Sequence, residues 1–237
     1  MDSRGKVALT KRNKMVAQKG LYVQFGCGLS APPGWLNFDA SPTLQVQRLP
    51  GVGRLLARPP RFPAFPENVR YGDIVRGLPL EAGSCEAVYC SHVLEHLALD
   101  DFRAALRNTL SYLRPGGTFR LVVPDLERLC AEYVASTDEG AALAFMENAH
   151  LGARQRARGF GGALRSWLGN SSHLSMWDFK SIGRELSTAG FSAIRRAEFG
   201  DSSDPRFREV EDPGRWNGCL GVACERPNVA RGSLGHS

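Results

Sequence analysis

The feature of the sequence that most constrains its fold is a short apolar run that ends in two closely spaced glycines. Residues Leu21 to Phe25 are apolar or aromatic apart from Gln24, and Gly26-Cys27-Gly28 follows directly. Because glycine adopts backbone angles that other residues avoid, this pattern predicts a buried strand with a sharp turn at its carboxyl end. In α/β sheets, ligands bind beyond the carboxyl ends of the strands, so this turn is the first candidate binding element.

The glycine turn also satisfies a dinucleotide-binding pattern, G-x-G-x-x-A, with Ala31 in the last position. That pattern requires a helix directly after the turn and an acidic residue about 20 residues further on. Here Pro32 and Pro33 interrupt a helix at once, and Asp39 comes only thirteen residues after Gly26. The spacing therefore argues against a nicotinamide cofactor.

Further apolar runs predict six more strands, with helices between most of them. The predicted strands cover residues 21–25, 35–39, 69–75, 87–90, 118–123, 192–199 and 219–225, and the predicted helices begin at about residues 92, 100, 125, 139 and 177. The helix that begins near residue 100 should stop at Pro115-Gly116-Gly117. Strands that alternate with helices are typical of a mostly parallel sheet with helices on both faces, here in one domain over residues 21–226.

Basic charge is concentrated in three segments. The chain has 30 Lys and Arg against 24 Asp and Glu, a formal charge of +6, and residues 1–20, 41–62 and 152–170 carry most of the excess. We interpret residues 1–20 as a flexible basic arm, 41–66 as a proline-rich basic insert, 152–175 as a Gly/Arg-rich flap and 227–237 as a flexible tail. Such segments suggest an anionic substrate or surface, although arginine-rich solvated loops would show the same pattern.

The cysteines and the lack of long apolar segments indicate the cellular compartment of the protein. The six cysteines include no C-x-x-C pair, and four of them lie in apolar runs, which is typical of free thiols in a reducing compartment. No run approaches the roughly 20 apolar residues of a membrane-spanning helix, and the first twenty residues lack a secretory apolar region. We therefore expect a soluble, cytoplasmic protein.

Two acidic residues lie at the ends of neighbouring predicted strands. Asp39 ends the second predicted strand, and Asp73 lies near the end of the third, followed by Ile74. Two carboxylates in this position suit the hydroxyls of a ribose and the exocyclic amine of an adenine, with Ile74 as an apolar wall for the ring. Each acid taken alone could equally be a turn residue or a helix cap.

Together these features resemble the class I S-adenosylmethionine-dependent methyltransferases. The resemblance rests on the segments Val23–Gly28, Asn37–Asp39, Gly72–Ile74, Ala87–Leu97 and Leu113–Gly117, and it is greatest to small-molecule and glycan-type methyltransferases with a short first glycine loop (methyltransferase type 11-like). It implies a Rossmann-like, doubly wound sheet of seven strands, mostly parallel, with helices on both faces and an antiparallel last strand. It also implies S-adenosylmethionine as the cofactor.

The resemblance assigns cofactor-binding roles by matching position. It places the glycine turn at the amino-acid end of the cofactor, Asp39 at the ribose, two residues at the adenine and two near the sulfonium: Gly26, Cys27, Gly28, Asp39, Asp73, Ile74, Ser91 and His92. The long helix that usually follows the glycine turn is missing here. The group that binds the cofactor carboxylate is therefore left open.

A hydroxyl or protonated amine acceptor needs a base, for which histidine is best matched near neutral pH. The candidates are His92, His96, His150, His173 and Asp125. We favour His173, which resembles a histidine that related enzymes often carry before the next helix, with His96 as the second catalytic candidate.

A metal site is an alternative use of the same residues. His92, Glu95 and His96 have the i, i+3, i+4 spacing that lies on one helical face, with His173 as a distant fourth ligand. Some RNA-end methyltransferases resemble this arrangement. Most relatives with the Glu-His pair are not thought to need a metal, so we expect none.

These features favour methyl transfer to oxygen or nitrogen of a polar acceptor, a small molecule or glycan, for which the basic segments suggest negative charge. The sequence pI of about 9.2 leaves a nucleic-acid (RNA) methyltransferase as an alternative, although no aromatic residues interleave with the basic runs. A non-catalytic cofactor-binding protein that docks on an anionic surface is the third possibility.

Overall fold

The computed structural model describes residues 20–49, 64–151 and 173–228, which form a sheet of seven strands in the order β3-β2-β1-β4-β5-β7-β6. The strands are β1 (Leu21–Phe25), β2 (Leu36–Asp39), β3 (Val69–Tyr71), β4 (Cys85–Ser91), β5 (Leu113–Pro124), β6 (Ser192–Ala197) and β7 (Cys219–Glu225). Only β7 is antiparallel to its neighbours among these strands. The Rossmann-like, mostly parallel sheet with an antiparallel last strand is thus confirmed.

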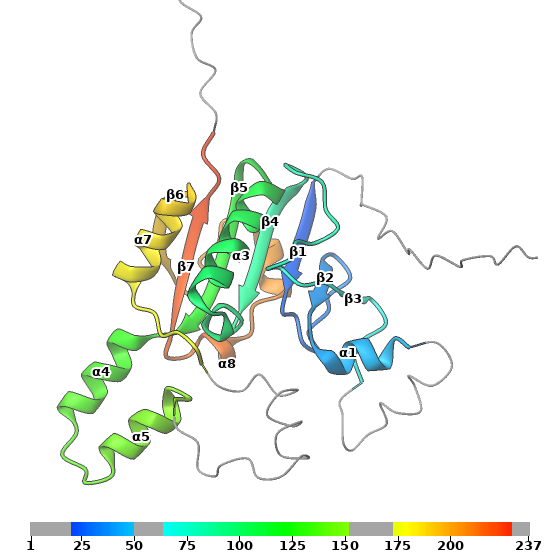
Figure 1. Cartoon of the computed structure of the whole chain (residues 1–237). Coiled ribbons are helices and arrows are strands. Elements are labelled where there is room, and N and C mark those ends of the chain that lie inside the picture. The colour runs from blue at the N-terminus through cyan, green and yellow to red at the C-terminus, as the bar shows by residue number, and fades with distance from the viewer. Residues whose placement is uncertain (1–19, 50–63, 152–172, 229–237) are drawn as a thin grey trace, which may run out of the picture.

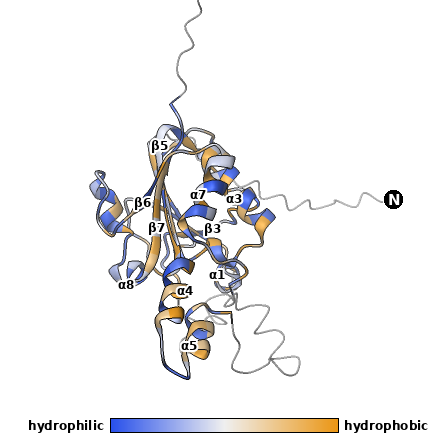
Figure 2. Cartoon of the chain, turned by 90° about the vertical axis from the view of Figure 1, so that its left-hand side faces the viewer, coloured by the Kyte–Doolittle hydropathy of each residue, from blue (hydrophilic) through white to orange (hydrophobic). Residues whose placement is uncertain are grey.

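Helices pack against both faces of the sheet and beyond its carboxyl end. They are α1 (Pro42–Gln47), α3 (Leu99–Tyr112), α4 (Leu126–Ala135), α5 (Ala141–Asn148), α7 (Phe179–Ala189) and α8 (Pro213–Trp216), with 3₁₀ turns η1 (Leu94–His96) and η2 (Pro205–Glu209). Helices α3 and α7 cover one face and α8 lies on the other (Figure 2), whereas α4 and α5 project past the strand ends (Figure 1). Within the described ranges, no helix is long and apolar enough to cross a membrane.

The main core lies between the sheet and the pair α3 and α7. Phe102 on α3 and Leu186 on α7 are fully buried there, and Phe102 stacks on Trp177 with ring centroids 4.3 Å apart. Helix α7 begins with a capping box between Asp178 and Ser181 and ends at Gly190 in the left-handed conformation. The helix begins two residues after the start predicted at about residue 177.

Several predicted bounds are wrong. The helix after residue 100 ends at Tyr112, and Leu113 already begins β5, so Pro115-Gly116-Gly117 lies inside the strand instead of stopping the helix. Burial of Leu113 against the core outweighs the turn-forming tendency of the three residues that follow. Strand β3 ends at Tyr71, four residues earlier than predicted.

The proline-rich insert and the segment after β4 also differ from prediction. Helix α1 lies inside the insert, since Ser41 caps its first turn and Pro42 suits the first helical position. After β4 the chain forms only the short turn η1, because His92 adopts a positive φ of 54° that no helix accommodates.

The face of the sheet opposite α3 is covered by residues 204–216, where the usual helix after β1 is missing. Trp35, Tyr89, Phe207 and Trp216 form an apolar cluster there, and the Trp216 indole lies so close to Gly221 that a Cβ on that glycine would approach it to 2.2 Å. The indole N–H of Trp216 donates to the Tyr89 hydroxyl over 3.2 Å. This packing fixes α8 against the carboxyl half of β4.

A buried arginine crosses this second face. Arg120 on β5 is only 1% exposed, and its guanidinium contacts Glu211 and Asp201 at 2.6 Å each. The same guanidinium lies over the rings of Phe207 and Trp216, at 5.3 and 5.1 Å from their centroids. Arg120 therefore holds the segment that carries α8 onto the sheet.

Replacing Arg120 should destabilise the protein strongly. We expect Arg120→Ala to lower the free energy of unfolding in urea by about 3–5 kcal/mol, because it leaves the buried Glu211 carboxylate without its partner. The matched control is Arg195→Ala, which removes a half-exposed partner of the same Asp201 and should cost at most about 1 kcal/mol. Equal losses in the two variants would contradict this role of Arg120.

Candidate functional site

The glycine turn after β1 brings the carboxyl ends of β1, β2 and β4 together. Gly26 has a φ of 64°, and a Cβ there would lie 2.1 Å from a methyl carbon of Val93, so only glycine fits. The amide of Gly28 donates to Asp39 Oδ2 over 2.9 Å, which ties the turn to the end of β2. Two pockets meet at this turn.

The first, which we call the β2 pocket, has a volume of about 410 Å³. It brings together most of the predicted cofactor-binding residues and one predicted catalytic histidine: Gly26, Asp39, Asp73, Ile74, His92 and His96. Asp39 is 8% exposed and accepts the Ser41 amide on Oδ1 over 2.8 Å. Each carboxylate oxygen keeps a further lone pair for a ligand hydroxyl.

Asp73 is a turn residue that also lines the β2 pocket. It lies two residues beyond the end of β3, and its Oδ1 accepts the amide of Val75 over 2.9 Å, as a turn residue does. It also lines the β2 pocket, next to Ile74. The turn holds the carboxylate in a fixed place at the pocket wall.

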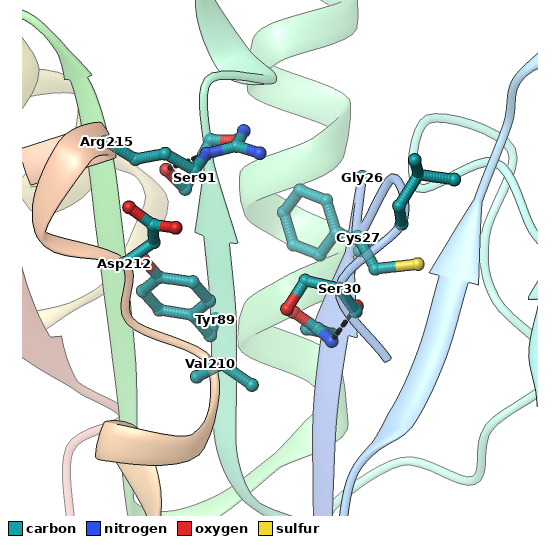
Figure 3. A pocket seen from close by; sticks show the side chains of 11 residues that line it. Gly26, Cys27, Ser30, Tyr89, Ser91, Val210, Asp212 and Arg215 are labelled. Carbon is teal, nitrogen blue, oxygen red and sulfur yellow. Dashed lines mark hydrogen bonds between the residues drawn. The ribbon is translucent and has the colours of Figure 1, made fainter. Parts of the chain in front are cut away.

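The second pocket, which we call the β4 pocket, has a volume of about 300 Å³. It contains two more of the predicted residues, Cys27 and Ser91, whereas Gly28 is not among the lining residues of either pocket. Figure 3 shows that Asp212 and Arg215 approach the β4 pocket from α8 and the residue before it. Arg215 Nε donates to Ser91 Oγ over 3.1 Å, and its Nη2 donates to the Ser91 carbonyl oxygen. The pocket thus holds one cation and one anion side by side.

Sequence reasoning missed Asp212 and Arg215. The only local signal is Asp212 before Pro213, a helix-start pattern, and Asp212 does cap α8 by accepting the amide of Gly214 over 2.7 Å. Nothing in the sequence places α8 against β4, because that contact depends on Trp216 and Arg120 packing across the sheet.

Cys27 is a thiol in the β4 pocket. Burial, with a smaller contribution from the nearby Asp39, raises the pKa of Cys27 to about 12. The group therefore stays protonated and is unsuited to act as a nucleophile.

His92 is a cationic link and not a base. Its Nδ1 lies 3.2 Å from Glu95 Oε1 and its Nε2 lies 2.9 Å from the Arg215 carbonyl oxygen, so both ring nitrogens donate. Burial lowers the pKa of His92, but hydrogen bonds with Cys219, Glu95 and the Arg215 carbonyl outweigh it and raise the pKa to about 10. The imidazolium thereby joins the segment after β4 to α8.

The predicted catalytic residues His96 and His173 lie together around Glu95. The fully buried Glu95 places Oε1 4.0 Å from Nε2 of each of these histidines, and the two imidazole rings have centroids 5.0 Å apart. The amides of Leu174 and Ser175 donate to the Glu95 carbonyl oxygen over 2.8 and 3.0 Å, which fixes the chain next to His173. The ring of His150 also packs against His173, with centroids 4.9 Å apart.

His173 is buried and neutral. It is 9% exposed, and burial lowers its pKa below the ordinary 6.5, with smaller effects of Glu95, His96 and His150. Two buried polar atoms of this group, Glu95 Oε2 and His173 Nδ1, have no hydrogen-bond partner among the described residues. His96, in contrast, is in the wall of the β2 pocket.

Two further sequence candidates have structural roles. Asp125, a candidate base, caps α4 by accepting the amides of Glu127 and Arg128. Arg48 of the basic insert donates to three carbonyl oxygens next to β3, those of Pro66, Glu67 and Val69. The other arginines of the predicted insert and flap, and most of the predicted arm and tail, lie outside the described residues.

A family model described as a methyltransferase domain matches residues 32–195, more than half of the chain. No curated protein matches the sequence significantly.

Several solved structures are similar to this chain at low sequence identity. A chain from the complex between the Haloferax volcanii Trm112 methyltransferase activator and the putative methyltransferase is 16% identical, with a TM-score of 0.46 and coverage of 90% of this chain and 86% of that one. PigF with SAH is 16% identical, with a TM-score of 0.45 and coverage of 90% of this chain. The match covers 58% of the PigF chain, so this chain spans less than two thirds of PigF. A Thermotoga maritima protein described as a SAM-dependent methyltransferase, possible histamine N-methyltransferase, is 16% identical, with a TM-score of 0.45. That match covers 89% of this chain and 84% of the other. These likenesses are weak, and the assignment to a family rests on the methyltransferase-domain match.

The environment of His92 predicts an unusual titration. In an NMR titration of the five histidines, His92 should stay protonated until about pH 10, whereas His173 should titrate below 6.5. Since the folded pKa of His92 is raised, its contribution to stability is complete below about pH 6.5 and is lost as the pH rises through about 10. Glu95→Gln should lower the pKa of His92. A His92 that titrates near 6.5 in the wild type would refute the double hydrogen bond.

Proposed function

The chain belongs to a family of methyltransferase domains, with S-adenosylmethionine as the methyl donor, and we propose that it methylates oxygen or nitrogen of a polar small molecule or glycan. The observation that carries this proposal is the pair of pockets that meet at Gly26. One pocket has two carboxylates and an apolar wall, and the other has an arginine beside an aspartate. These linings complement the two chemically different ends of S-adenosylmethionine.

The adenosine end suits the β2 pocket. Asp39 can accept hydrogen bonds from both ribose hydroxyls while it holds the Gly28 and Ser41 amides. Asp73 can accept from the exocyclic amine of the adenine, and Ile74 offers an apolar surface for the ring. Cofactor binding then uses a site that the turns after β2 and β3 already hold in place.

The amino-acid end suits the β4 pocket. A guanidinium pairs with a carboxylate through two parallel hydrogen bonds, and Arg215 is the cation in this pocket. Asp212 can accept from the cofactor ammonium. In this proposal Arg215 of α8 is the group that binds the cofactor carboxylate, which the missing helix after β1 leaves unassigned. The sulfonium lies between the pockets, near Gly26 and Ser91.

Methyl transfer needs the acceptor in line with the bond between sulfur and methyl carbon. A lone pair of the acceptor forms the new bond to the methyl carbon, the sulfur–methyl bond breaks, and its electron pair stays on sulfur to give neutral S-adenosylhomocysteine. The proton of the acceptor passes to a base. His96 lines the β2 pocket, and the neutral His173 packs against the His96 ring. We therefore propose that these two histidines accept the proton.

The acceptor approaches where the chain enters and leaves segment 152–172. The amide of His173 donates to the His150 carbonyl oxygen over 3.4 Å, so both described ends of that segment lie at the histidines. The segment carries four arginines and no acidic residue. This supports an anionic acceptor. It can be identified in a cell extract by the cofactor-dependent mass gain that results when a methyl group replaces one hydrogen.

The cysteines support a reducing compartment such as the cytoplasm. All six are free, and four are buried in the core. Burial raises the pKa of Cys85 to about 11 and keeps it unreactive.

Calorimetry with two ligands tests how the cofactor is divided between the pockets. 5′-Methylthioadenosine shares the nucleoside of S-adenosylhomocysteine but lacks its amino acid. Asp39→Ala should weaken both ligands about tenfold or more, as expected from a lost charge-assisted bond of about 1.5–3 kcal/mol. Arg215→Met should weaken S-adenosylhomocysteine by a similar factor and leave the nucleoside within about twofold.

The control for net charge is Arg208→Met, which removes an exposed arginine of η2 and should leave both affinities unchanged. If Arg215→Met weakens both ligands equally, Arg215 does not bind the amino-acid end. If the wild type binds neither ligand, the proposed cofactor site is wrong.

The catalytic histidines should affect the chemical step. With the acceptor identified, His173→Asn should lower kcat by about 10²- to 10⁴-fold while S-adenosylhomocysteine affinity stays within about twofold. His96→Asn should act in the same direction, because it removes the member of the pair that lines the pocket. Thermal unfolding of both variants controls for damage to the fold, and retention of most of kcat in both would show that neither accepts the proton.

A further inference from the structure

We propose that Glu95, His96 and His173 form a binding site for a divalent transition-metal ion at the edge of the β2 pocket. Each residue offers one ligand atom, and these atoms lie within 4.8 Å of one another. Glu95 Oε1 is 4.0 Å from Nε2 of both histidines. The alternative drawn from sequence also included His92, but that ring is occupied by Glu95 and the Arg215 carbonyl oxygen, so the other three residues form the site.

The donor set selects the class of ion. Two imidazoles and one carboxylate suit zinc and other first-row divalent metals, whereas magnesium and calcium prefer oxygen ligands. Zinc lies about 2.0–2.2 Å from such ligands, so two ligand atoms 4.0 Å apart must draw slightly together around an ion. Three protein ligands leave a fourth position open, as in zinc sites where a water or substrate binds.

Two buried atoms of the site support the proposal independently. Glu95 Oε2 and His173 Nδ1 are both inaccessible and have no hydrogen-bond partner in the part of the chain that the structure describes. The side chain of Glu95 is fully buried and that of His173 is 5% exposed. A buried carboxylate oxygen without a partner is unfavourable, and an ion held by both carboxylate oxygens of Glu95 would satisfy it. Either ring nitrogen of His173 can serve, because turning the ring over exchanges them.

The surrounding structure holds the ligands in place. His92 donates to Glu95 Oε1, the kind of outer contact that orients a ligating carboxylate. The Glu95 carbonyl oxygen accepts the amides of Leu174 and Ser175, so the chain that carries His173 is fixed to the residue beside it in the site. The ligand positions therefore depend on these backbone contacts.

The location of the site indicates its use. His96 lines the β2 pocket, so an open coordination position faces the space where the acceptor would meet the methyl group. A bound ion there would polarise an acceptor oxygen and ease loss of its proton. This role deepens the proposed function, since the histidines would act as ligands in the metal-loaded protein. The binding of the metal itself does not depend on methyl transfer.

The test is a titration of the metal-free full-length chain with Co²⁺, followed by visible absorption, and with Zn²⁺, followed by calorimetry. We expect one ion per chain, with cobalt bands typical of nitrogen and oxygen ligands. Glu95→Gln and His96→Gln should each weaken binding by roughly 100-fold, since even outer-sphere changes cost about 10- to 100-fold. The half-buried His96 keeps the test valid if Glu95→Gln does not fold.

The matched control is His150→Asn, which removes the exposed neighbouring histidine and replaces it with a residue that tolerates its positive φ of 50°. This variant should bind Co²⁺ and Zn²⁺ with an affinity within about twofold of the wild type. A thiolate-to-cobalt band that persists in Glu95→Gln would place the ion on a cysteine, such as the exposed Cys130, and would overturn the proposal. Absence of binding in the folded wild type would do the same.

The two proposals fail separately. Binding of S-adenosylhomocysteine without metal binding would leave the methyltransferase site intact and remove the metal site. Metal binding without binding of S-adenosylhomocysteine would leave the metal site intact and remove the proposed cofactor site. Removal of the ion from the loaded protein should lower the rate of methylation without changing S-adenosylhomocysteine affinity by more than about twofold.

Discussion

The close contact between Gly26 and Val93 sets the geometry on which the rest of the site depends. Any side chain at position 26 would collide with Val93, so the turn after β1 lies directly against the segment that follows β4. The Gly28 amide then reaches Asp39 and ties in the end of β2. One tight approach thus brings together the ends of three strands, with a pocket on each side of the turn.

The short glycine loop leaves the face of the sheet opposite α3 without the helix that usually covers it. Without a helix after β1, this face needs another cover, and residues 204–216 provide it through Arg120, Phe207 and Trp216. The same packing carries Arg215 to Ser91 at the end of β4. A buried charge network is costly to desolvate, and here it positions a segment that a purely apolar contact would orient less specifically.

Local signals allowed much of the fold to be predicted. The seven strands and the antiparallel last strand follow from apolar runs and the family resemblance, and α7 begins close to its predicted start. The predicted bounds failed at Leu113, where burial in the core outweighed turn-forming residues, and after Tyr71, where the turn at Gly72 and Asp73 ends the strand early. The β2 pocket could be predicted because strand-end residues of one parallel sheet meet at one edge. Arg215 could not, because long-range packing alone brings α8 to β4.

The most direct test of this account is a crystal structure of the full-length protein with S-adenosylhomocysteine. We predict that the ligand crosses Gly26, with its ribose on Asp39, its adenine beside Ile74 and its carboxylate on Arg215. The strand ends and α8 should move little, because the contacts that hold them exist without the ligand. A ligand bound elsewhere, or with its amino acid in the β2 pocket and its adenine at Arg215, would contradict the account.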